Sequence, residues 1–384
     1  MLLANVDVSV HGHRGTHARE GSATLATTAG PLITAGTTDA SRRRWFVGPR
    51  VDIWFVLGVG ALLSVALFVA SSHKTWFLLA AVLFAMLSDY PHVLQTSARI
   101  WLDPRERARH GRHYLVSLAI TGAVVTGLMF GHLVLVLVTV WAYWQVLHVL
   151  KQHYGILNIY ASKNGYRSSR RLAKYVLFAG CIAPFIFRAA HGLRFSEYVV
   201  FGYRLPFSNL TVPTPPIPWM VIAAGYAVFL ILLVLFVREQ ASLARAGKKP
   251  LPGMAIATMA SAIVAYNLSY LLVSDLFALI LIATTTHSLQ YHLINWTRNS
   301  TRFARSPDPG ERRLLLARLS RPRAVPMYAA FFAVLGVVTG QIDTMLLGVI
   351  PLTLVFHHFY LDGVIWKNKA NPELAYDLGI AAAL

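Results

Sequence analysis

Seven of the chain's fifteen histidines lie within long apolar segments, where an ionisable side chain is costly and indicates a functional site. All seven fall near the same end of their segments. They are His92, His148, His153, His287, His292, His357 and His358. Neutral imidazoles are ligands for iron, copper and zinc. Seven of them at one depth, with Asp89 and Asp362 beside them, predict a metal centre assembled from several transmembrane helices.

Three of these segments each carry two candidate ligands five residues apart. The pairs are His148/His153, His287/His292 and His357/Asp362. Five residues turn an ideal helix by about 500°, which leaves the two side chains roughly 140° apart. Both can flank one site if the helix edge points at it, or if a π-type turn widens the pitch. Two other pairs share a face, namely His358 with Asp362 at i and i+4, and Asp89 with His92 at i and i+3.

The chemistry of the set favours non-haem iron, with copper as an alternative. A single intramembrane histidine can serve only to hydrogen-bond a neighbouring helix, and Asp362 can orient His358 instead of binding a metal. One spacing that recurs three times at one depth favours a metal site. Seven histidines exceed the need of one ion, so we expect two ions, or one ion with further histidines hydrogen-bonded around it. The only cysteine is Cys181, which excludes a thiolate-only site.

The segments that must position these residues are helices of membrane-spanning length. The chain of 384 residues is 56% hydrophobic and 13% charged, and its mean hydropathy is +0.53. Apolar runs long enough to cross roughly 30 Å of hydrocarbon recur along it. We place them at about 51–71, 75–98, 114–131, 133–158, 172–190, 216–238, 253–272, 274–296, 325–345 and 347–366. The sequence thus predicts an all-α polytopic transmembrane bundle of about ten spans over residues 45–384.

The net charge of +19 is concentrated in alternate connections. Basic clusters lie at Arg42–Arg50, Arg99–Arg112, Lys163–Lys174, Arg238–Lys249 and Arg298–Arg323, and Lys367 follows the last segment. The positive-inside rule explains this pattern better than a nucleic-acid partner does, and it places both termini in the cytoplasm. The histidines then lie roughly 10–15 Å from the cytoplasmic boundary at about 1.5 Å per residue. The basic connections are expected to attract anionic membrane lipids.

Residues 1–44 predict a disordered cytoplasmic tail, because they are rich in Thr, Ala, Gly and Ser and contain no apolar run. We expect the tail histidines His11, His13 and His17 to be solvated. The run from Pro213 to Pro218 predicts an extended stretch before the sixth span.

Four short motifs resemble those of the Brp/Blh family of bacterial membrane β-carotene 15,15′-dioxygenases. In chain order they are Pro91-His92, His153-Tyr-Gly155-Ile-Leu-Asn158, His287/His292 and His357-x4-Asp362. Asn158 stands where the family has aspartate, and no glycine follows His92. The resemblance implies an integral protein of a bacterial inner membrane that cleaves a carotenoid with dioxygen.

By this resemblance five histidines would bind the metal: His92, His153, His287, His292 and His357. Asp362 would be a ligand or an orienting group, while His148 and His358 would complete a second ion's shell or transfer protons. Residues expected to hydrogen-bond the ligands are Asp89, Gln152, Asn158 and Tyr291. Trp144 and Tyr154 are expected to line a substrate slot.

The His-x4-His pairs and His357-His358 also resemble, more loosely, the histidine boxes of di-iron membrane fatty-acyl desaturases and hydroxylases. We therefore expect a membrane oxygenase with one or two non-haem iron ions, a lipophilic substrate, dioxygen and a cytoplasmic electron donor. A lipid desaturase or hydroxylase is the first alternative. A metal-ion or proton transporter that uses intramembrane histidines is the second. An acyl- or glycosyltransferase with a histidine base leaves the repeated five-residue spacing unexplained.

Overall fold

The computed structural model describes residues 44–200, 203–204, 208–341, 349–367 and 373–380. The chain divides into two units, Met1–Asp39 and Ala40–Leu384, and the first lies outside the described residues. The predicted tail over residues 1–44, with its three histidines, therefore falls almost wholly outside them. The second unit is the helical body that contains all the other predicted site residues.

The described chain is almost entirely helical, which confirms the predicted all-α polytopic bundle. Two long helices contain a π-helical segment: α2 (Pro49–Asp52), η1 (Ile53–Gly58) and α3 (Val59–Ala70) are continuous, as are α4 (Lys74–Phe84), η2 (Ala85–Asp89) and α5 (Tyr90–Leu102). The other long helices are α6 (Pro104–Phe130), α7 (Val134–Lys163), α8 (Arg171–His191), α9 (Trp219–Arg245), α10 (Gly253–Leu272), α11 (Leu276–Ala304), α13 (Val325–Gln341) and α14 (Val349–Ile365).

The remaining elements are short and lie in the connections. The 3-10 turns and short helices are η3 (Glu311–Arg313), α12 (Leu315–Leu319), η4 (Pro322–Ala324) and α15 (Leu374–Asp377). Between α8 and α9, β1 (Leu193–Arg194) pairs antiparallel with β4 (Thr211–Val212), and β2 (Val199–Val200) pairs with β3 (Tyr203–Arg204). The predicted extended stretch at Pro213–Pro218 is free of helix and strand up to the start of α9.

Local sequence signals fix several helix boundaries. Asp103 and Asp275 precede α6 and α11, and each side chain accepts a hydrogen bond from a backbone N–H of the first turn. His132 adopts a left-handed φ of 59° between α6 and α7, so the predicted division there is confirmed. The division between α10 and α11 near Asp275 is confirmed as well. The last predicted division, near residues 340–344, lies mostly outside the described part of the chain.

The predicted start of the third span at residue 114 is wrong by about three turns. α6 begins at Pro104, because the Asp103 cap and the following proline nucleate the helix there. The arginines between Arg105 and Arg112 are consequently helical and do not form the loop that their charge suggested.

Within the described residues, seven helices are long and apolar enough to cross a membrane, by length and composition. They are Pro49–Ala70, Lys74–Leu102, Pro104–Phe130, Val134–Lys163, Arg171–His191, Trp219–Arg245 and Gly253–Leu272. These helices are compatible with an integral membrane protein. α13 and α14 are shorter apolar helices, and α11 is not among the seven. That these last three also cross the membrane stays a prediction.

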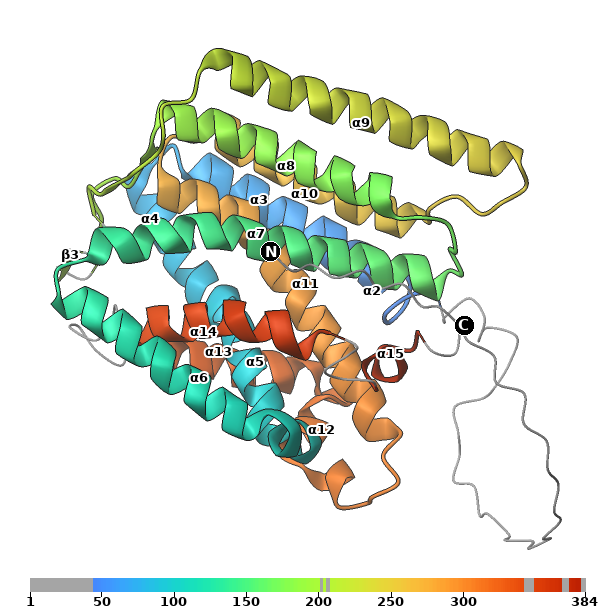
Figure 1. Cartoon of the computed structure of the whole chain (residues 1–384). Helices are drawn as coiled ribbons and strands as arrows, with labels where there is room; N and C mark the ends of the chain where they lie inside the picture. The colour runs from blue at the N-terminus through green and yellow to red at the C-terminus, as the bar shows by residue number, and fades with distance from the viewer. Residues whose placement is uncertain (1–43, 201–202, 205–207, 342–348, 368–372, 381–384) are drawn as a thin grey trace, which may run out of the picture. The chain divides into compact units, whose positions relative to one another are not determined.

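α11 is the central helix of the unit. Every residue from Ala278 to Tyr291 is buried, so no face of this stretch is open to lipid. α3, α5, α7 and α10 all pack against α11. In Figure 1 it crosses obliquely between an upper layer containing α8, α9 and α10 and a lower layer containing α6, α13 and α14. The neighbouring helices therefore provide the polar contacts that the polar side chains of α11 need and that lipid could not provide.

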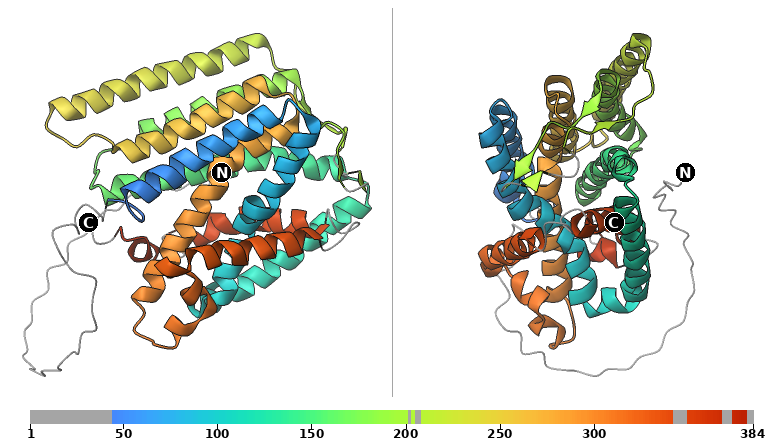
Figure 2. Two further views of the ribbon diagram at one scale, coloured as in Figure 1. Left: turned by 180° about the vertical axis from the view of Figure 1, so that it is seen from behind. Right: turned by 90° about the vertical axis from the view of Figure 1, so that its left-hand side faces the viewer.

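The basic connections and the weakly charged connections of the sequence lie at opposite ends of the helices. In Figure 1 the basic connections from α7 to α8 and from α9 to α10 lie at the right, whereas the turn from α6 to α7 and the strands lie at the left. The end-on view in Figure 2 shows the strands in front of the helices at the second end. We call the first end the basic end and the second the strand end.

Several charges at the basic end are buried, which their positions in basic connections did not predict. Arg99, Arg298 and Arg302 are at most 3% exposed. Glu106 accepts hydrogen bonds from Arg99 at 2.9 Å and from Arg298 at 2.6 Å. Asp103 lies 3.3 Å from both Arg298 and Arg302. A buried network of paired charges therefore joins α5, α6 and α11.

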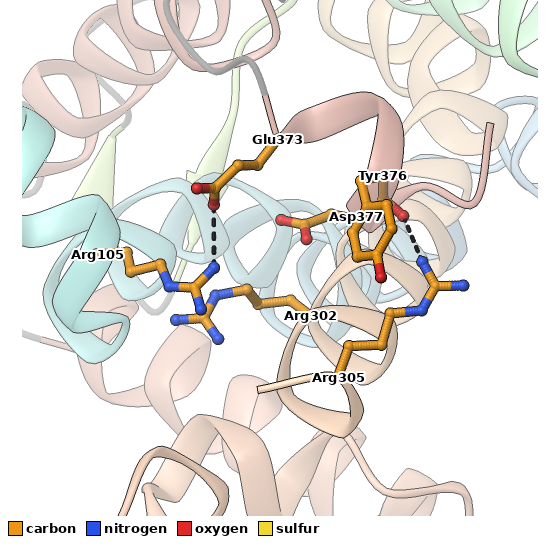
Figure 3. A pocket seen from close by; sticks show the side chains of 6 residues that line it. All are labelled: Arg105, Arg302, Arg305, Glu373, Tyr376 and Asp377. Carbon is orange, nitrogen blue, oxygen red and sulfur yellow. Dashed lines mark hydrogen bonds and ion pairs between the residues drawn. The ribbon is translucent and has the colours of Figure 1, made fainter. Parts of the chain in front are cut away.

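The short helix α15 extends this network. Asp377 lies 3.3 Å from Arg298, and Glu373 accepts a hydrogen bond from Arg105 at 3.0 Å. Figure 3 shows Arg105, Arg302 and Arg305 gathered beside α15, around a cavity of about 260 Å³. Every cation drawn there has an acidic or carbonyl partner. We therefore regard this cavity as part of a structural network.

Candidate metal centre

Four imidazole rings from four different helices form a closed ring inside the protein. His92 lies on α5, His148 on α7, His287 on α11 and His358 on α14. The distance between ring centroids is 5.2 Å from His92 to His287 and 5.0 Å from His287 to His148. It is 4.9 Å from His148 to His358 and 5.0 Å from His358 back to His92. We call these four residues the histidine ring.

Each member of the histidine ring has a buried nitrogen without a hydrogen-bond partner. These atoms are Nδ1 and Nε2 of His92, Nε2 of His148, Nδ1 of His287 and Nε2 of His358. None of the four residues is more than 6% exposed. An unsatisfied buried polar atom costs about 1–3 kcal/mol. Five of them, on four converging rings, indicate a common ligand.

The donor atoms are close enough to share an ion. Those of His92, His287 and His358 lie within 4.8 Å of one another, and so do those of His148, His358 and Asp362. Ligands on opposite sides of an ion are roughly 4.2 Å apart when each metal–nitrogen bond is about 2.1 Å. Small side-chain shifts would therefore close either group around a metal. His358 belongs to both groups, so the arrangement suits one ion or two adjacent ions.

A hydrogen-bonded group behind His358 fixes the orientation of that ring. Thr96 Oγ1 lies 2.8 Å from His358 Nδ1, 2.6 Å from the Tyr291 hydroxyl and 3.1 Å from Asp362 Oδ1. The Tyr291 hydroxyl donates to the same carboxylate oxygen at 2.7 Å. Thr96 had not been singled out in the sequence. Its position four residues after His92, on the same helical face, is the signal that could have identified it.

Asp362 thus has a defined place beside the histidine ring. Its Oδ1 accepts from Tyr291 and Thr96, and lies 3.6 Å from His358 Nδ1. This geometry suits the orienting role. Asp362 also belongs to one of the two donor groups, so its position is compatible with direct ligation.

Two other residues expected to hydrogen-bond ligands lie close to the histidine ring. Asp89 is 3.4 Å from His92 Nδ1 and accepts a hydrogen bond from the Ser288 hydroxyl at 2.8 Å. Gln152 donates to the backbone carbonyl of His287 at 2.8 Å, which ties α7 to α11. For Asn158, the described residues show no hydrogen bond to a ring histidine.

Three of the histidines predicted as ligands lie outside both donor groups. His292 is engaged at both nitrogens, by Gln95 at Nδ1 and by the Ser88 carbonyl, 3.0 Å from Nε2. His357 bonds the Ser117 hydroxyl at 2.8 Å. The ring centroid of His153 is 6.4 Å from that of His287, farther than any neighbouring pair in the histidine ring.

The angular offset along a helix explains this separation. Residues five positions apart diverge by roughly 140°, so α7 and α11 each place one histidine in the histidine ring and the other on a different face of the helix. On α14 the i, i+4 pair of His358 and Asp362 faces the centre in place of His357. No π-type turn widens these helices at the pairs. The π-helical segment η2 instead ends at Asp89, three residues before His92.

Aromatic side chains cover one flank of the histidine ring. His148 stacks on Phe359 with centroids 4.4 Å apart, and Phe359 lies 5.9 Å from Trp144. Trp144 therefore lies one aromatic ring beyond His148, and its role in lining a substrate slot stays a prediction. Tyr154 lies elsewhere, because its ring faces the Lys174 ammonium of α8 at 5.8 Å.

Comparison with known proteins adds no relative to this description. No protein-family model matches the chain, and neither a curated protein nor a solved structure matches it.

Proposed function

We propose that the chain is a membrane-embedded non-haem iron oxygenase that acts on a lipophilic substrate. The observation that supports this most directly is the convergence of four buried imidazole rings, each with an unpartnered nitrogen, from α5, α7, α11 and α14. His292 and His357 each bond a protein partner, and His153 has two unpartnered nitrogens but lies outside the donor groups, so it is the convergence of the four rings that points to a shared ion.

The donor set favours iron over a structural zinc site. All its donors are imidazoles and a carboxylate, and Cys181 is buried on α8 without any place in the two donor groups. Copper remains the alternative metal. A bound iron ion would supply the activation of dioxygen. The protein would hold that ion with His92, His148, His287 and His358, and would orient His358 through Thr96 and Asp362.

The surroundings of the centre support a lipophilic substrate. The centre lies among apolar helices, and His148 stacks on Phe359, which in turn contacts Trp144. A long hydrocarbon or polyene chain would contact such side chains without unsatisfied polar groups. Carotenoid cleavage is the specific reaction implied by the motif resemblance. Desaturation or hydroxylation of an acyl chain is the second candidate, because the two donor groups that share His358 suit a two-ion site.

Matched substitutions on single helices test the metal centre. Three helices carry one histidine inside the histidine ring and another outside it: His148 and His153 on α7, His287 and His292 on α11, and His358 and His357 on α14. We expect His148→Gln, His287→Gln and His358→Gln each to lose most of the bound iron, measured by elemental analysis of protein purified in detergent. Their three partner variants should retain it. Metal-free wild-type protein, or equal loss in both members of every pair, would refute the proposal.

Expression in cells that make β-carotene tests the reaction. Cleavage predicts bleaching of the cells and the formation of retinal, both abolished by His358→Gln and kept by His357→Gln. Unchanged carotenoid together with altered acyl chains in the membrane lipids would favour the second candidate. If an iron-loaded protein altered neither pool, an oxygenase acting on these substrates would be excluded.

A further inference from the structure

The strand end of the molecule contains a basic pocket that neither the charge pattern nor the metal centre explains. The connection between α8 and α9 was expected to carry little charge. Yet Arg188, His191 and Arg194 line a cavity of about 460 Å³ there, together with Ser196, Ser274 and Asp275. The cavity is within the range of roughly 300–1,000 Å³ typical of small-molecule sites.

Arg188 is held in a fixed position in this pocket by backbone carbonyls of α10. It is only 9% exposed, and its guanidinium donates from Nε to the Tyr270 carbonyl at 2.9 Å and from Nη2 to the Leu271 carbonyl at 3.1 Å. These bonds satisfy the carbonyls at the C-terminus of α10 and fix the guanidinium in place. No hydrogen bond of its Nη1 is found within the described part of the chain. One face of a rigid, buried cation therefore remains available to a ligand.

The two other basic side chains are placed by the end of α8. His191 Nδ1 donates to the Phe187 carbonyl at 2.8 Å, so Nε2 of the neutral ring is left as an acceptor for a hydroxyl group of a ligand. Gly192 adopts a φ of +95°, which side chains rarely tolerate, and a Cβ built there would lie 3.4 Å from Arg194 Nε. The glycine thus ends the helix and leaves room for the Arg194 guanidinium beside the turn.

The carboxylate of Asp275, the acidic group in the pocket, already accepts hydrogen bonds from the protein itself. Asp275 accepts hydrogen bonds from the Ser196 backbone at 2.6 Å, from the Tyr198 hydroxyl at 2.5 Å and from the Ala278 backbone at 2.8 Å. Three donors satisfy its carboxylate, and its single charge offsets only one of the two arginines. The pocket keeps a positive excess, and the hydroxyls of Ser196 and Ser274 add neutral donors.

We propose that this pocket, lined by Arg188, His191 and Arg194, binds a phosphate group. Guanidinium groups match the oxygens of phosphate in geometry and charge, and hydrogen bonds between charged partners are about twice as strong as neutral ones. The phosphate can belong to a lipid head group, since the neighbouring helix α9 is almost wholly exposed and would be lined by lipid. It can also be a free phosphate. The site is separate from the histidine ring and does not depend on a metal.

Binding to the full-length, delipidated protein in detergent tests this proposal. The probes are phosphatidylglycerol, diacylglycerol with the same acyl chains, and inorganic phosphate, with binding followed by native mass spectrometry and calorimetry. We expect Arg194→Gln and His191→Gln each to weaken phosphate binding by roughly tenfold. The control Arg167→Gln removes an exposed charge in the basic connection between α7 and α8 and should leave the affinity unchanged.

The three probes separate the sources of the phosphate. Binding of phosphatidylglycerol but not of diacylglycerol or inorganic phosphate assigns the site to a lipid head group, whereas competition by inorganic phosphate assigns it to the free ion. The proposal is overturned if no phosphate probe binds, or if Arg194→Gln and His191→Gln bind as the wild type does. The iron content of both variants should match the wild type, so failure here is distinguishable from failure of the metal centre.

Discussion

The side chains around His358 show how a short polar group can fix the geometry of a buried centre. Thr96 contacts His358, Tyr291 and Asp362 through one oxygen atom, so a single hydroxyl links α5, α11 and α14. Partners of this kind orient metal-binding imidazoles and set which nitrogen carries the proton. We therefore expect the centre to be sensitive to residues that do not themselves bind the ion.

Replacing Thr96 by valine tests this expectation. Thr96→Val keeps the shape of the side chain but removes the bond to His358 Nδ1, so the affinity for iron should fall about 10- to 100-fold. Competition with a chelator measures that affinity. Thr285→Val is the matched control, because the Thr285 hydroxyl is equally buried and bonds only the Leu281 carbonyl of its own helix. If Thr96→Val and Thr285→Val lost the same affinity for iron, altered packing and not the missing bond to His358 would explain the loss.

Replacing Asp362 by asparagine distinguishes the two roles of this residue. If the carboxylate orients His358 through its Oδ1, Asp362→Asn should still bind iron in the wild-type ratio, with an affinity lowered by about 10- to 100-fold. Iron titration followed by elemental analysis gives both quantities. A variant that binds no iron at saturation would instead assign Asp362 as a ligand.

At the scale of elements, two features hold the four ligand helices together. The central helix α11 contributes His287 and Tyr291 to the centre and continues into Arg298 and Arg302 at the basic end. There the buried charge network joins it to α5 and α6. Removing one partner from a buried ion pair leaves an uncompensated charge, whereas an exposed pair contributes little.

Glu106→Gln should therefore destabilise the protein strongly. The substitution leaves Arg99 and Arg298 without their shared carboxylate, which is 3% exposed, and we expect a loss of about 3–5 kcal/mol. Thermal unfolding in detergent should show a large fall in Tm. Glu373→Gln removes an acidic partner that is 48% exposed and should change Tm very little. If the two variants unfolded alike, the buried network would have no special structural role.

Lowering the pH should remove the stability that Glu311 contributes in the connection after α11. The hydrogen bond from Arg302 lowers the pKa of Glu311 to about 2, from an ordinary value of 4.5. This carboxylate therefore stabilises the folded protein fully above about pH 4.5, and the contribution disappears as the pH falls toward 2. Glu311→Gln should lose stability on the order of 1 kcal/mol at pH 6 and approach the wild type near pH 2. Thermal unfolding across this range measures the difference, and a constant difference would contradict the assignment.

At the scale of the whole molecule, the two ends have different chemistry. Most Lys and Arg residues belong to the connections of the basic end, whereas the strand end carries the short strands and the pocket of Arg188, His191 and Arg194. By the positive-inside rule we predict that the basic end faces the cytoplasm.

Cysteine labelling tests this orientation. In a Cys181→Ser background, which removes the only native thiol, Thr211→Cys lies on β4 at the strand end and Lys248→Cys lies between α9 and α10. A membrane-impermeant maleimide should label Thr211→Cys in intact cells, and Lys248→Cys only after permeabilisation. The reverse pattern would invert the topology and move the histidine ring to the outer half of the membrane.

The sequence alone determined most of the helices and placed the seven histidines within them, although the apolar run from residue 114 did not show that α6 begins at Pro104. Apolar runs, the Asp103-Pro104 start of α6 and the turn at His132 are local signals, because they depend on residues close together in the chain. They define the helices without reference to any neighbour. The basic connections likewise follow from composition.

Only the tertiary structure decided which side chains meet. A five-residue spacing places two histidines on different faces of a helix, and the rotation of that helix against its neighbours determines which face is central. Packing against α5 and α11 turns His358 of α14 inward, while His357 faces Ser117 of α6. The burial of Arg298, the contacts of Thr96 and the pocket around Arg188 also depend on residues distant in the sequence. Such contacts are set by the packing of whole helices, which local periodicity does not encode.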